Sequence, residues 1–560
     1  MGKTKPNKIK VKDKDKANDK LDRNSKFNKQ RMDDIREEGK QKGVKADLNP
    51  KLNDASSYTP TPQLVKDVCN ISMYTRTGVN LDMGIPWVNP VTHAQSGIIP
   101  GIMNLYFIPT FGVSSDYSDP FNVNAQAIYA YVRKANSGRI NYDPSDLMCY
   151  LGAISSALLY HAILCGIIGK SMKYDASNAY YPEGLVDGYG VDFWDVRKNM
   201  PTLRSYVNQF ALKINNYFFP DVFPFLKEQL KMVLNCYKDG DSGKAQVYQF
   251  IPTHFYMYDE KSSEQGSSLS AVKFVSNTDV MNTLKRRKVD DLIQFGDQLL
   301  NALTQSSDTG IYDGDLRKAY ETNRYIASEI GEQFIIEPTK SDEILMKINN
   351  LTIWPDVDLL GTSLDFTPNI NRQTLTQVIQ YPSFEFGEEF SASEVLKLIN
   401  SNKIVNFYWD NVTPDDVLVA TRWMTFGAFD THVATAREGE TLIQLDNYGF
   451  EIFTGSNIAY RRQPGVSNLN GFAYRKLTTT MQGSEFAENL ITASIAALEK
   501  FSSHPFFYKY LCTNEDGTYV NPELFDIIGD FDNYAVVSKS TVQNIHLVAT
   551  EGGLGLPQSI

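Results

Sequence analysis

Residues 147–168 are the feature that most constrains the fold, because none of these 22 residues is Lys, Arg, Asp or Glu. Asp143 is a candidate N-cap before this stretch, and Pro144 suits the first position of a helix. Gly169 and Lys170 supply the usual stop. A helix of this length measures about 33 Å. The stretch is therefore either a helix buried on all sides or a membrane span.

Five polar side chains interrupt the apolar stretch, at positions around the helix: Tyr150, Ser155, Ser156, Tyr160 and His161. The sequence holds no second stretch of this kind, and the aromatic belts that flank membrane spans are missing. The sequence therefore predicts the core helix of a soluble protein rather than a membrane span.

Length and cysteine usage fit a globular protein of several structural units. The length of 560 residues predicts three or four units. The apolar content of 42% is that of a globular protein. The five cysteines are scattered and never form a close pair, which indicates a reducing compartment and free, mostly buried thiols. They are Cys69, Cys149, Cys165, Cys236 and Cys512.

Charge is distributed unevenly along the chain. The net charge is −11, from 55 basic and 66 acidic residues. Residues 1–54 hold 17 basic and 10 acidic residues, a net charge of +7. The remainder holds 38 basic and 56 acidic residues, a net charge of −18. An acidic body thus carries a basic arm.

The basic arm, residues 1–55, has no sustained apolar periodicity, so we expect it to be disordered alone. Such a flexible polycation can neutralise phosphates without contacting bases, and Phe27 is its only aromatic residue for stacking. The arm therefore predicts sequence-independent RNA binding, with a solubilising tail as the alternative. The candidate nucleic-acid-binding residues are Lys3, Lys5, Lys8, Lys10, Lys12, Lys14, Lys16, Lys20, Arg23, Lys26, Lys29 and Arg31.

Apolar periodicity predicts the main elements of the body. It indicates a strand at 101–111 and helices at 124–134, 203–217, 225–237, 279–303 and 484–501. Residues 247–258 alternate as an edge strand or a pair of strands, and residues 260–270 indicate a surface loop. Residues 404–461, including VLVATRWMTF at 417–426, alternate with turn residues and indicate an antiparallel β-rich part.

Sequence motifs of catalysis and nucleotide binding are not found. GDSGK at 240–244 resembles a phosphate loop, but two residues rather than four separate its glycines, and Ala245 follows the lysine. A turn is the better interpretation. GxSxG, HExxH and GxGxxG do not occur in the sequence. We therefore predict neither an enzyme nor a cofactor.

Two groups of residues are candidate metal sites. His161 and Cys165 lie four residues apart, which suits two ligands on one helix face, but no third ligand is near in sequence. A buried histidine beside a buried thiol is the better interpretation. Asp308, Asp313 and Asp315 miss the spacing of a calcium loop and favour a solvated loop. No metal site is predicted.

One stretch before the apolar helix carries a family resemblance. DPFNVNAQAIYAYVRKANSGRINYDPSDLMCYLGA, residues 119–153, is similar to the capsid proteins of picobirnaviruses, which have a segmented double-stranded RNA genome. Three weaker similarities follow in the same order: LRSYVNQFA at 203–211, KAQVYQFIP with FYMY within 244–258, and DDVLVATRWMT at 415–425.

The resemblance implies a structural protein that forms dimers and assembles into an icosahedral shell around the viral RNA. Its expected location is the virion, assembled in the host cytoplasm. The resemblance says nothing of contact with a host membrane or receptor. A nonstructural RNA-binding protein with a basic tail is the alternative function.

Helix-rich ends around a β-richer middle predict an α+β fold, with a mainly helical shell domain and an inserted, β-richer projecting domain. The resemblance implies the same two parts. The expected divisions are the disordered basic arm at 1–55, the first part of the shell domain at 56–260, the projecting domain at 261–470 and the second part of the shell domain at 471–560.

Overall fold

The computed structural model describes residues 60–68, 101–173, 181–241, 245–260, 266–280, 285–354, 363–382, 402–429, 442–461, 472–477, 480–481, 501–513, 519–528, 531 and 533–555. The chain divides into two compact units, Met1–Tyr74 and Thr75–Ile560. Within the first unit only one element is described, the short helix α2, Pro62–Val68. All other described elements belong to the second unit.

Helix α4, Pro144–Ser171, is the apolar helix expected from the sequence. The Asp146 carboxylate accepts a hydrogen bond from the Asp143 backbone N–H at 3.1 Å, and Pro144 occupies the first turn. Every residue of α4 except Asp146 is buried. The prediction of a core helix is confirmed.

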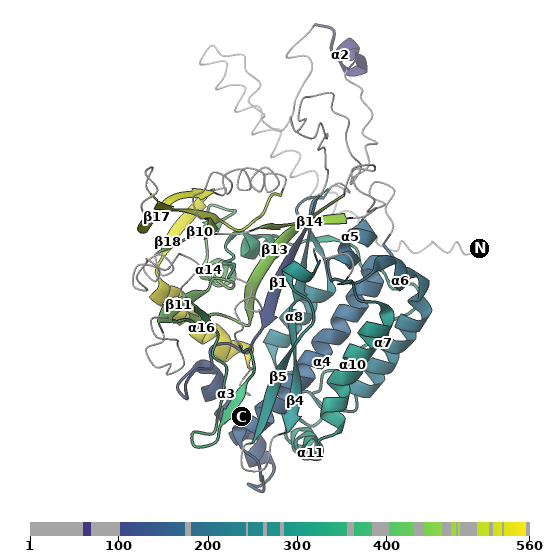
Figure 1. Ribbon diagram of the computed structural model, residues 1–560, viewed down its shortest axis with the longest axis vertical. Helices are drawn as coiled ribbons and strands as arrows, with labels where there is room; N and C mark the ends of the chain where they lie inside the picture. The colour runs from purple at the N-terminus through teal and green to yellow at the C-terminus, as the bar shows by residue number, and fades with distance from the viewer. Residues whose placement is uncertain are drawn as a thin grey trace, which may run out of the picture. The chain divides into compact units, whose positions relative to one another are not determined.

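Other helices pack on α4 from several sides, as Figure 1 shows for α7, α8 and α10. Each turns an apolar stripe inward, such as Leu203, Val207 and Phe210 of α7. The surrounding helices are α3 Pro120–Ala135, α5 Tyr181–Asp187, α6 Phe193–Lys198, α7 Met200–Ile214, α8 Pro224–Leu234, α10 Val289–Thr304 and α11 Asp308–Tyr320.

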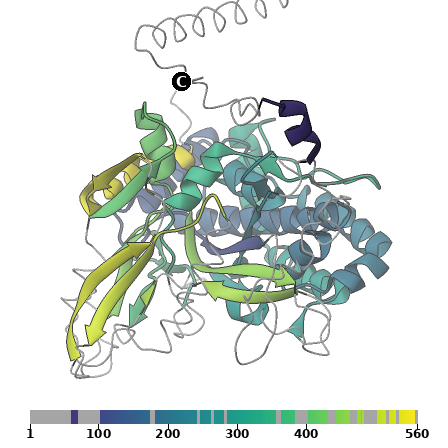
Figure 2. The same ribbon diagram turned by 90° about the horizontal axis from the view of Figure 1, so that it is seen from above.

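A six-stranded sheet contributes the other half of the core, in the order β14-β13-β1-β3-β2-β6. Strand β1 lies in its middle, antiparallel to β13 and parallel to β3, and all residues of β1 and β3 are buried. Figure 2 shows green β13 next to dark blue β1. The strands are β1 Ile102–Pro109, β2 Tyr237–Lys238, β3 Val247–Pro252, β6 Thr339–Lys340, β13 Glu451–Arg461 and β14 Phe472–Leu477.

Buried amide side chains cross the centre of this sheet. Asn104 Nδ2 donates to Asn457 Oδ1 at 2.8 Å, and Gln249 Nε2 donates to Asn104 Oδ1 at 2.6 Å. The Tyr106 hydroxyl accepts from Asn457 Nδ2 and donates to the Gly188 carbonyl. A shift of one residue would leave these buried groups without partners, so the network fixes the register of β13, β1 and β3.

Smaller elements complete the described body. Strands β4 His254–Glu260 and β5 Ser267–Lys273 form a hairpin against α4. The other strands form small sheets: β7 Thr367–Asn369 with β8 Thr374–Thr376, β11 Phe426–Phe429 with β12 Leu442–Asn447 and β9 Gln380–Pro382, β10 Lys403–Phe407 with β18 Asn533–Val537, and β15 Thr480–Met481 with β16 Phe507–Thr513 and β17 Tyr519–Ile528. The remaining helices are α9 Asn277–Val280, α12 Asp342–Asn349, α14 Pro414–Ala420 and α16 Lys539–Gly553.

Most predicted elements are confirmed with small shifts of their ends. The strand at 101–111 is β1, the helix at 124–134 lies within α3, and residues 247–258 form the strands β3 and β4. The helices predicted at 203–217 and 225–237 are α7 and α8. The helix predicted at 484–501 and the basic arm lie outside the described residues.

Three local predictions were wrong. Part of the strand expected at 417–426 is helix α14, because Thr413 caps it by accepting from the Asp416 N–H and Pro414 begins its first turn. The loop expected at 260–270 contains the start of β5, in which Leu269 is buried and pairs with Phe366. The helix expected at 279–303 is not continuous: residues 279–280 belong to α9, and α10 starts at Val289, because the Arg287 backbone N–H bonds to the Gly190 carbonyl.

The α+β class is confirmed by these helices and sheets. The division into shell and projecting domains stays a prediction. Helices α10 and α11 contact α4, and β13 pairs with β1, so these parts of 261–470 belong to the core described above.

Candidate functional site

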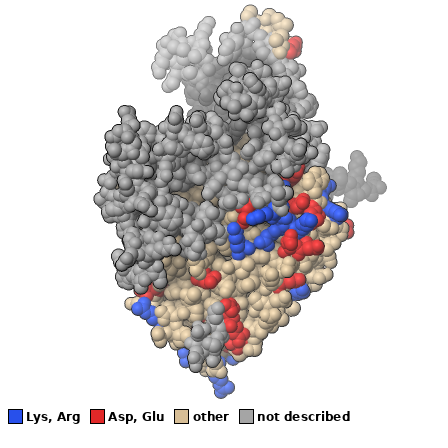
Figure 3. Space-filling view, viewed as in Figure 1, with Lys and Arg blue, Asp and Glu red and all other residues tan. Residues whose placement is uncertain are grey.

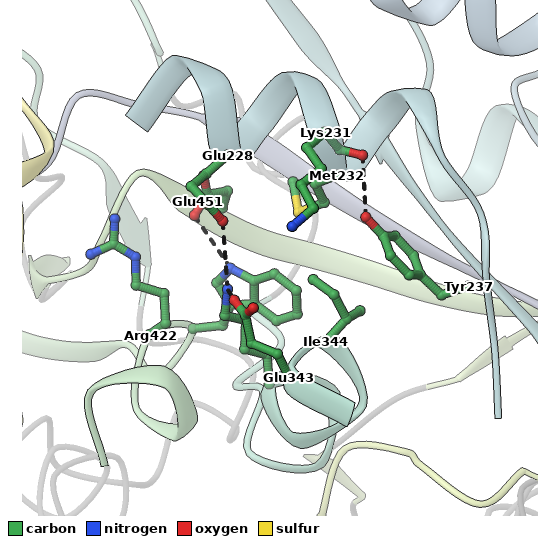
Figure 4. A pocket seen from close by; sticks show the side chains of 10 residues that line it. Glu228, Lys231, Met232, Tyr237, Glu343, Ile344, Arg422 and Glu451 are labelled. Carbon is green, nitrogen blue, oxygen red and sulfur yellow. Dashed lines mark hydrogen bonds and ion pairs between the residues drawn. The ribbon is translucent and has the colours of Figure 1, made fainter. Parts of the chain in front are cut away.

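The twelve residues predicted to bind RNA all lie in the basic arm, Lys3 to Arg31, outside the described residues. Their role stays a prediction. Among the described residues, one small pocket is lined largely by charged side chains and is called the charged pocket here (Figure 4). The charged pocket lies among α8, β2, α12, the turn after α14 and β13, and its lining residues are Glu228, Lys231, Met232, Tyr237, Glu343, Ile344, Lys347, Arg422, Trp423 and Glu451.

Lys347 is the centre of the ion pairs in the charged pocket. Its Nζ lies 2.6 Å from Glu343 Oε1, one turn earlier on α12, and 4.0 Å from Glu228 Oε2 on α8. The same ammonium lies 5.6 Å from the centre of the Trp423 ring. Burial would raise the pKa of Glu343, but the charge and hydrogen bond of Lys347 lower it overall. Lys347 therefore links α8, α12 and the turn after α14.

Glu451 is the buried carboxylate of the charged pocket, at the start of β13. Its Oε2 accepts a hydrogen bond from the Trp423 indole N–H at 3.3 Å. Burial raises the pKa of the Glu451 carboxyl, and the positive charge of nearby Arg422 opposes that rise. The guanidinium of Arg422 also lies 4.9 Å from the centre of the Phe450 ring.

The charged pocket is too small for a nucleotide or a peptide. Its volume of about 30 Å³ leaves room for one or two water molecules. Its charged side chains come from four segments between residues 228 and 451, and Lys347 pairs with both Glu343 and Glu228. The arrangement therefore supports a structural junction between early and late parts of the chain rather than a ligand site.

Sequence reasoning did not find the charged pocket. Glu228, Glu343, Arg422 and Glu451 occur in four separate segments, and none of these segments carries a motif. Long-range packing alone brings the four side chains together, so no local signal could have shown the pocket.

The pair His161 and Cys165 lies on α4, as expected from its spacing. Cys165 Sγ is 3.6 Å from His161 Nε2, and the imidazole stacks on Phe210 with a centroid distance of 6.3 Å. Burial lowers the pKa of His161 to about 4 and raises that of Cys165 to about 12. Both groups are thus neutral at pH 7. The prediction of a buried histidine beside a buried thiol is confirmed.

The other cysteines for which the structure describes side chains are Cys149 and Cys236, and both are free and buried like Cys165. Burial raises the pKa of the Cys149 thiol well above its usual range. Cys69 lies outside the described residues, and so does the side chain of Cys512. A neutral buried thiol is a poor nucleophile.

The sequence favoured a solvated loop for Asp308, Asp313 and Asp315. The three residues lie instead on helix α11. Asp313 pairs with Arg317 at 2.6 Å and accepts from the Phe218 backbone N–H. Asp315 accepts a hydrogen bond from the Tyr142 hydroxyl at 3.1 Å. Their spacing within one helix lets these carboxylates anchor α11. Across the described residues, no three His, Cys, Asp or Glu side chains are placed to hold a metal ion.

On the described part of the face in Figure 3, Lys and Arg side chains gather mainly in one band, with Asp and Glu side chains directly beside it. One helix of the described residues, α4, is long and apolar enough to cross a membrane, and its most apolar stretch is completely buried. This burial agrees with a core helix.

Comparison with known proteins identifies the family. The family model described as the picobirnavirus capsid protein matches residues 57–537. The chain belongs to the picobirnavirus capsid protein family. The capsid protein precursor of human picobirnavirus (strain Human/Thailand/Hy005102/-) is 26% identical to this chain over 501 residues, which cover 86% of this chain and 82% of the relative.

A solved structure shares the fold of this picobirnavirus capsid family member. The X-ray crystallographic structure of the picobirnavirus capsid matches with a TM-score of 0.73 and 21% identity, covering 90% of this chain and 100% of the other. The resemblance carried by residues 119–153 is thus confirmed. The chain is a structural protein of the virion, and membership of a capsid requires that it associates with itself.

Proposed function

We propose that copies of this chain assemble, through dimers, into a closed icosahedral shell that encloses a segmented double-stranded RNA genome in the host cytoplasm. The role is structural and includes no catalytic step. The observation that carries the proposal is the family match over residues 57–537, which includes nearly the whole body and starts just after the basic arm. Closed shells need repeated contacts between identical subunits, which the folded body must supply.

We propose the arm as the contact to RNA because the arm is net basic and the rest of the chain is net acidic. The body after residue 54 carries a net charge of −18, while residues 1–54 carry +7. RNA held against the body would be repelled within a Debye length of about 10 Å.

Deletion of residues 1–51 tests the proposed function of the arm. We expect shells to assemble almost as before, because the packing surfaces lie in the body, while the RNA inside falls severalfold. The ratio of absorbance at the nucleic-acid and protein maxima, with RNA extraction from purified particles, measures this. Truncated shells that hold as much RNA as the full chain would show that the arm is a solubilising tail.

We also propose that the projecting part of 261–470 is carried by residues between α12 and β13. Strand β8 of the β7–β8 hairpin contacts α4, but the tip of the hairpin at residues 369–373 is exposed and is the candidate outward-facing point. A short Gly/Ser-flanked tag inserted after Asn371 should leave particles intact and bind antibody. A tag that stays hidden on intact particles would place this hairpin away from the outer surface.

A further inference from the structure

Strand β18 has an open edge among the described residues. It pairs antiparallel with β10 through Lys403–Val537 to Phe407–Asn533, and these two strands form a sheet of their own. The inner side of β10 is fixed, because Val405 and Phe407 pack into a buried cluster with Val542 of α16. The other edge of β18 has no described strand beside it. Figure 1 shows β10 and β18 side by side, near α14.

The open strand carries an exposed apolar ridge, formed by Phe531, Tyr534 and Val536. Their exposed fractions are 40%, 58% and 61%. The ridge has a fixed shape, because Phe531 stacks on buried Phe506 at 5.1 Å and meets the Tyr534 ring edge-on at 5.8 Å. Packing on Phe506 therefore orders the ridge, and its solvent-facing side is free to make a contact.

The strand itself lacks the usual protection of an open edge, and its nearest charged residue in the sequence is Asp532. Residues 533–537, Asn-Tyr-Ala-Val-Val, include no charged residue and no proline, although both commonly guard open edges. Lys539, the next basic residue, is engaged elsewhere, at 2.7 Å from Asp446 Oδ2. An apolar, unguarded edge is a template for another extended strand.

We propose that β18 pairs with β18 of a second copy of this chain, antiparallel about a two-fold axis. This rests on the proposed self-assembly and names a surface for it. Antiparallel pairing of a strand with itself is self-complementary, so one surface serves both copies. An axis beside Ala535, the middle of the exposed run, sets Tyr534 of one copy opposite Val536 of the other, a favoured aromatic and β-branched pair.

The strand pair needs a wider contact around it. Five paired residues bury less than the roughly 800 Å² per partner of a standard stable interface. Further exposed apolar side chains lie near the same sheet, Leu418 on α14, which contacts β10, and Val412 just before α14. The strand pair thus sets the register of a larger contact.

The first test is Val536→Lys in the full chain, with Val548→Lys on α16 as the matched control, because both valines are similarly exposed. We expect Val536→Lys to weaken self-association about tenfold or more in sedimentation equilibrium, since pairing would bury a lysine. The control should associate like the wild type, and both should keep the wild-type melting temperature. A Val536→Lys variant that associates normally overturns the proposal.

Two further variants test the register itself. Adding Tyr534→Glu to Val536→Lys places opposite charges across the axis and should restore association. Ala535→Cys should give a disulfide-linked dimer on mild oxidation, in excess of any formed by the unaltered chain under the same conditions. Absence of both effects overturns the pairing, whether or not Val536→Lys folds well.

The controls separate this inference from the proposed function. A wild-type chain that never self-associates contradicts the proposed function. A wild type that assembles, together with a Val536→Lys variant that assembles equally, contradicts only the pairing of β18. If removal of residues 1–59 abolishes association and Val536→Lys does not, the arm is the contact and the edge strand is not.

Discussion

At the scale of single residues, two buried histidines give the body a pH response. Burial lowers the pKa of His161 to about 4, and burial lowers that of His546 to about 4 as well. His546 Nε2 donates to the Thr421 carbonyl at 2.9 Å, and nearby Arg422 disfavours its charged form further. Both rings are therefore neutral in the folded protein where an exposed histidine would be charged.

The two histidines therefore destabilise the fold in mild acid, and buried Asp187, whose pKa is raised to about 7, contributes with the opposite sign over the same range. In the unfolded chain both histidines regain a pKa near 6.5, so the unfolded state binds more protons between about pH 6.5 and 4. The contribution of the two histidines to the free energy of unfolding is complete above pH 6.5. As the pH falls towards 4, it is lost at about 1.4 kcal/mol per histidine per pH unit. Thermal melting of the body at pH 7, 6 and 5 measures this loss.

The variant His161→Phe isolates one of the two histidines, because the phenyl ring can keep the stack on Phe210 without titrating. We expect the drop in melting temperature between pH 7 and pH 5 to become smaller than in the wild type. A drop equal to that of the wild type would show that His161 is charged in the folded protein, against its burial.

A charge in the middle of α4 is a second residue-scale prediction. Ala157 is fully buried, so Ala157→Asp would bury a carboxylate without a partner at a cost of several kcal/mol, roughly. We expect the variant to give almost no soluble protein. The matched change Ala157→Ser should be tolerated, because a serine hydroxyl can donate to the helix backbone one turn earlier. Wild-type yield and particles from Ala157→Asp would refute the core assignment.

At the scale of elements, α4 depends on a glycine for close packing. A Cβ atom at Gly169 would lie 2.6 Å from Ile336 Cγ1 and 2.9 Å from Phe334 Cε1, closer than such atoms approach. At Gly166, on the same helix, the nearest atom to a Cβ would be the Leu234 carbonyl oxygen at 3.4 Å. The two glycines therefore differ in what an added methyl group meets.

We expect Gly169→Ala to destabilise the body by about 1–3 kcal/mol through overpacking. Gly166→Ala should be neutral or stabilising by up to about 1 kcal/mol, because alanine favours the helix. Chemical denaturation of both variants measures the difference. Equal stability of the two variants would show that segment 334–336 does not pack closely on α4.

Local sequence patterns predicted elements better than they predicted how elements combine. The apolar stretch, the caps and the helical periodicity sufficed for α3, α4, α7 and α8. Alternation failed for α14, because the capping signal of Thr413 and Pro414 outweighs the β-branched residues that follow. The charged pocket and the pairing of β1 with β13 depend on contacts over more than 200 residues, which single-sequence patterns do not encode.

At the scale of the whole molecule, the charge divides between arm and body. A single arm offers only modest attraction, because Asp13, Asp15, Asp19 and Asp22 dilute its lysines. Many arms on one inner surface would act together, and their combined attraction would be strong. RNA retention is then a property of the assembly rather than of one chain.

Neutralising the lysines between Lys3 and Lys20 should remove most of the RNA from assembled particles without blocking assembly. In the wild type, RNA binding should be blind to sequence and should weaken steeply with salt, by about 0.9 logarithmic units per phosphate contact per tenfold rise. Filter binding with unrelated RNAs at several salt concentrations measures both properties. Sequence preference or a flat salt dependence would contradict a backbone-binding arm.

The proposal that copies of this chain build a closed shell is tested most directly by microscopy of the purified full chain. Negative-stain images, with light scattering on the same sample, should show closed particles of uniform size that carry nuclease-resistant RNA. A nonstructural RNA-binding protein would instead form small soluble oligomers that coat RNA. Monodisperse monomers or such small oligomers at every salt and pH tried would contradict the account.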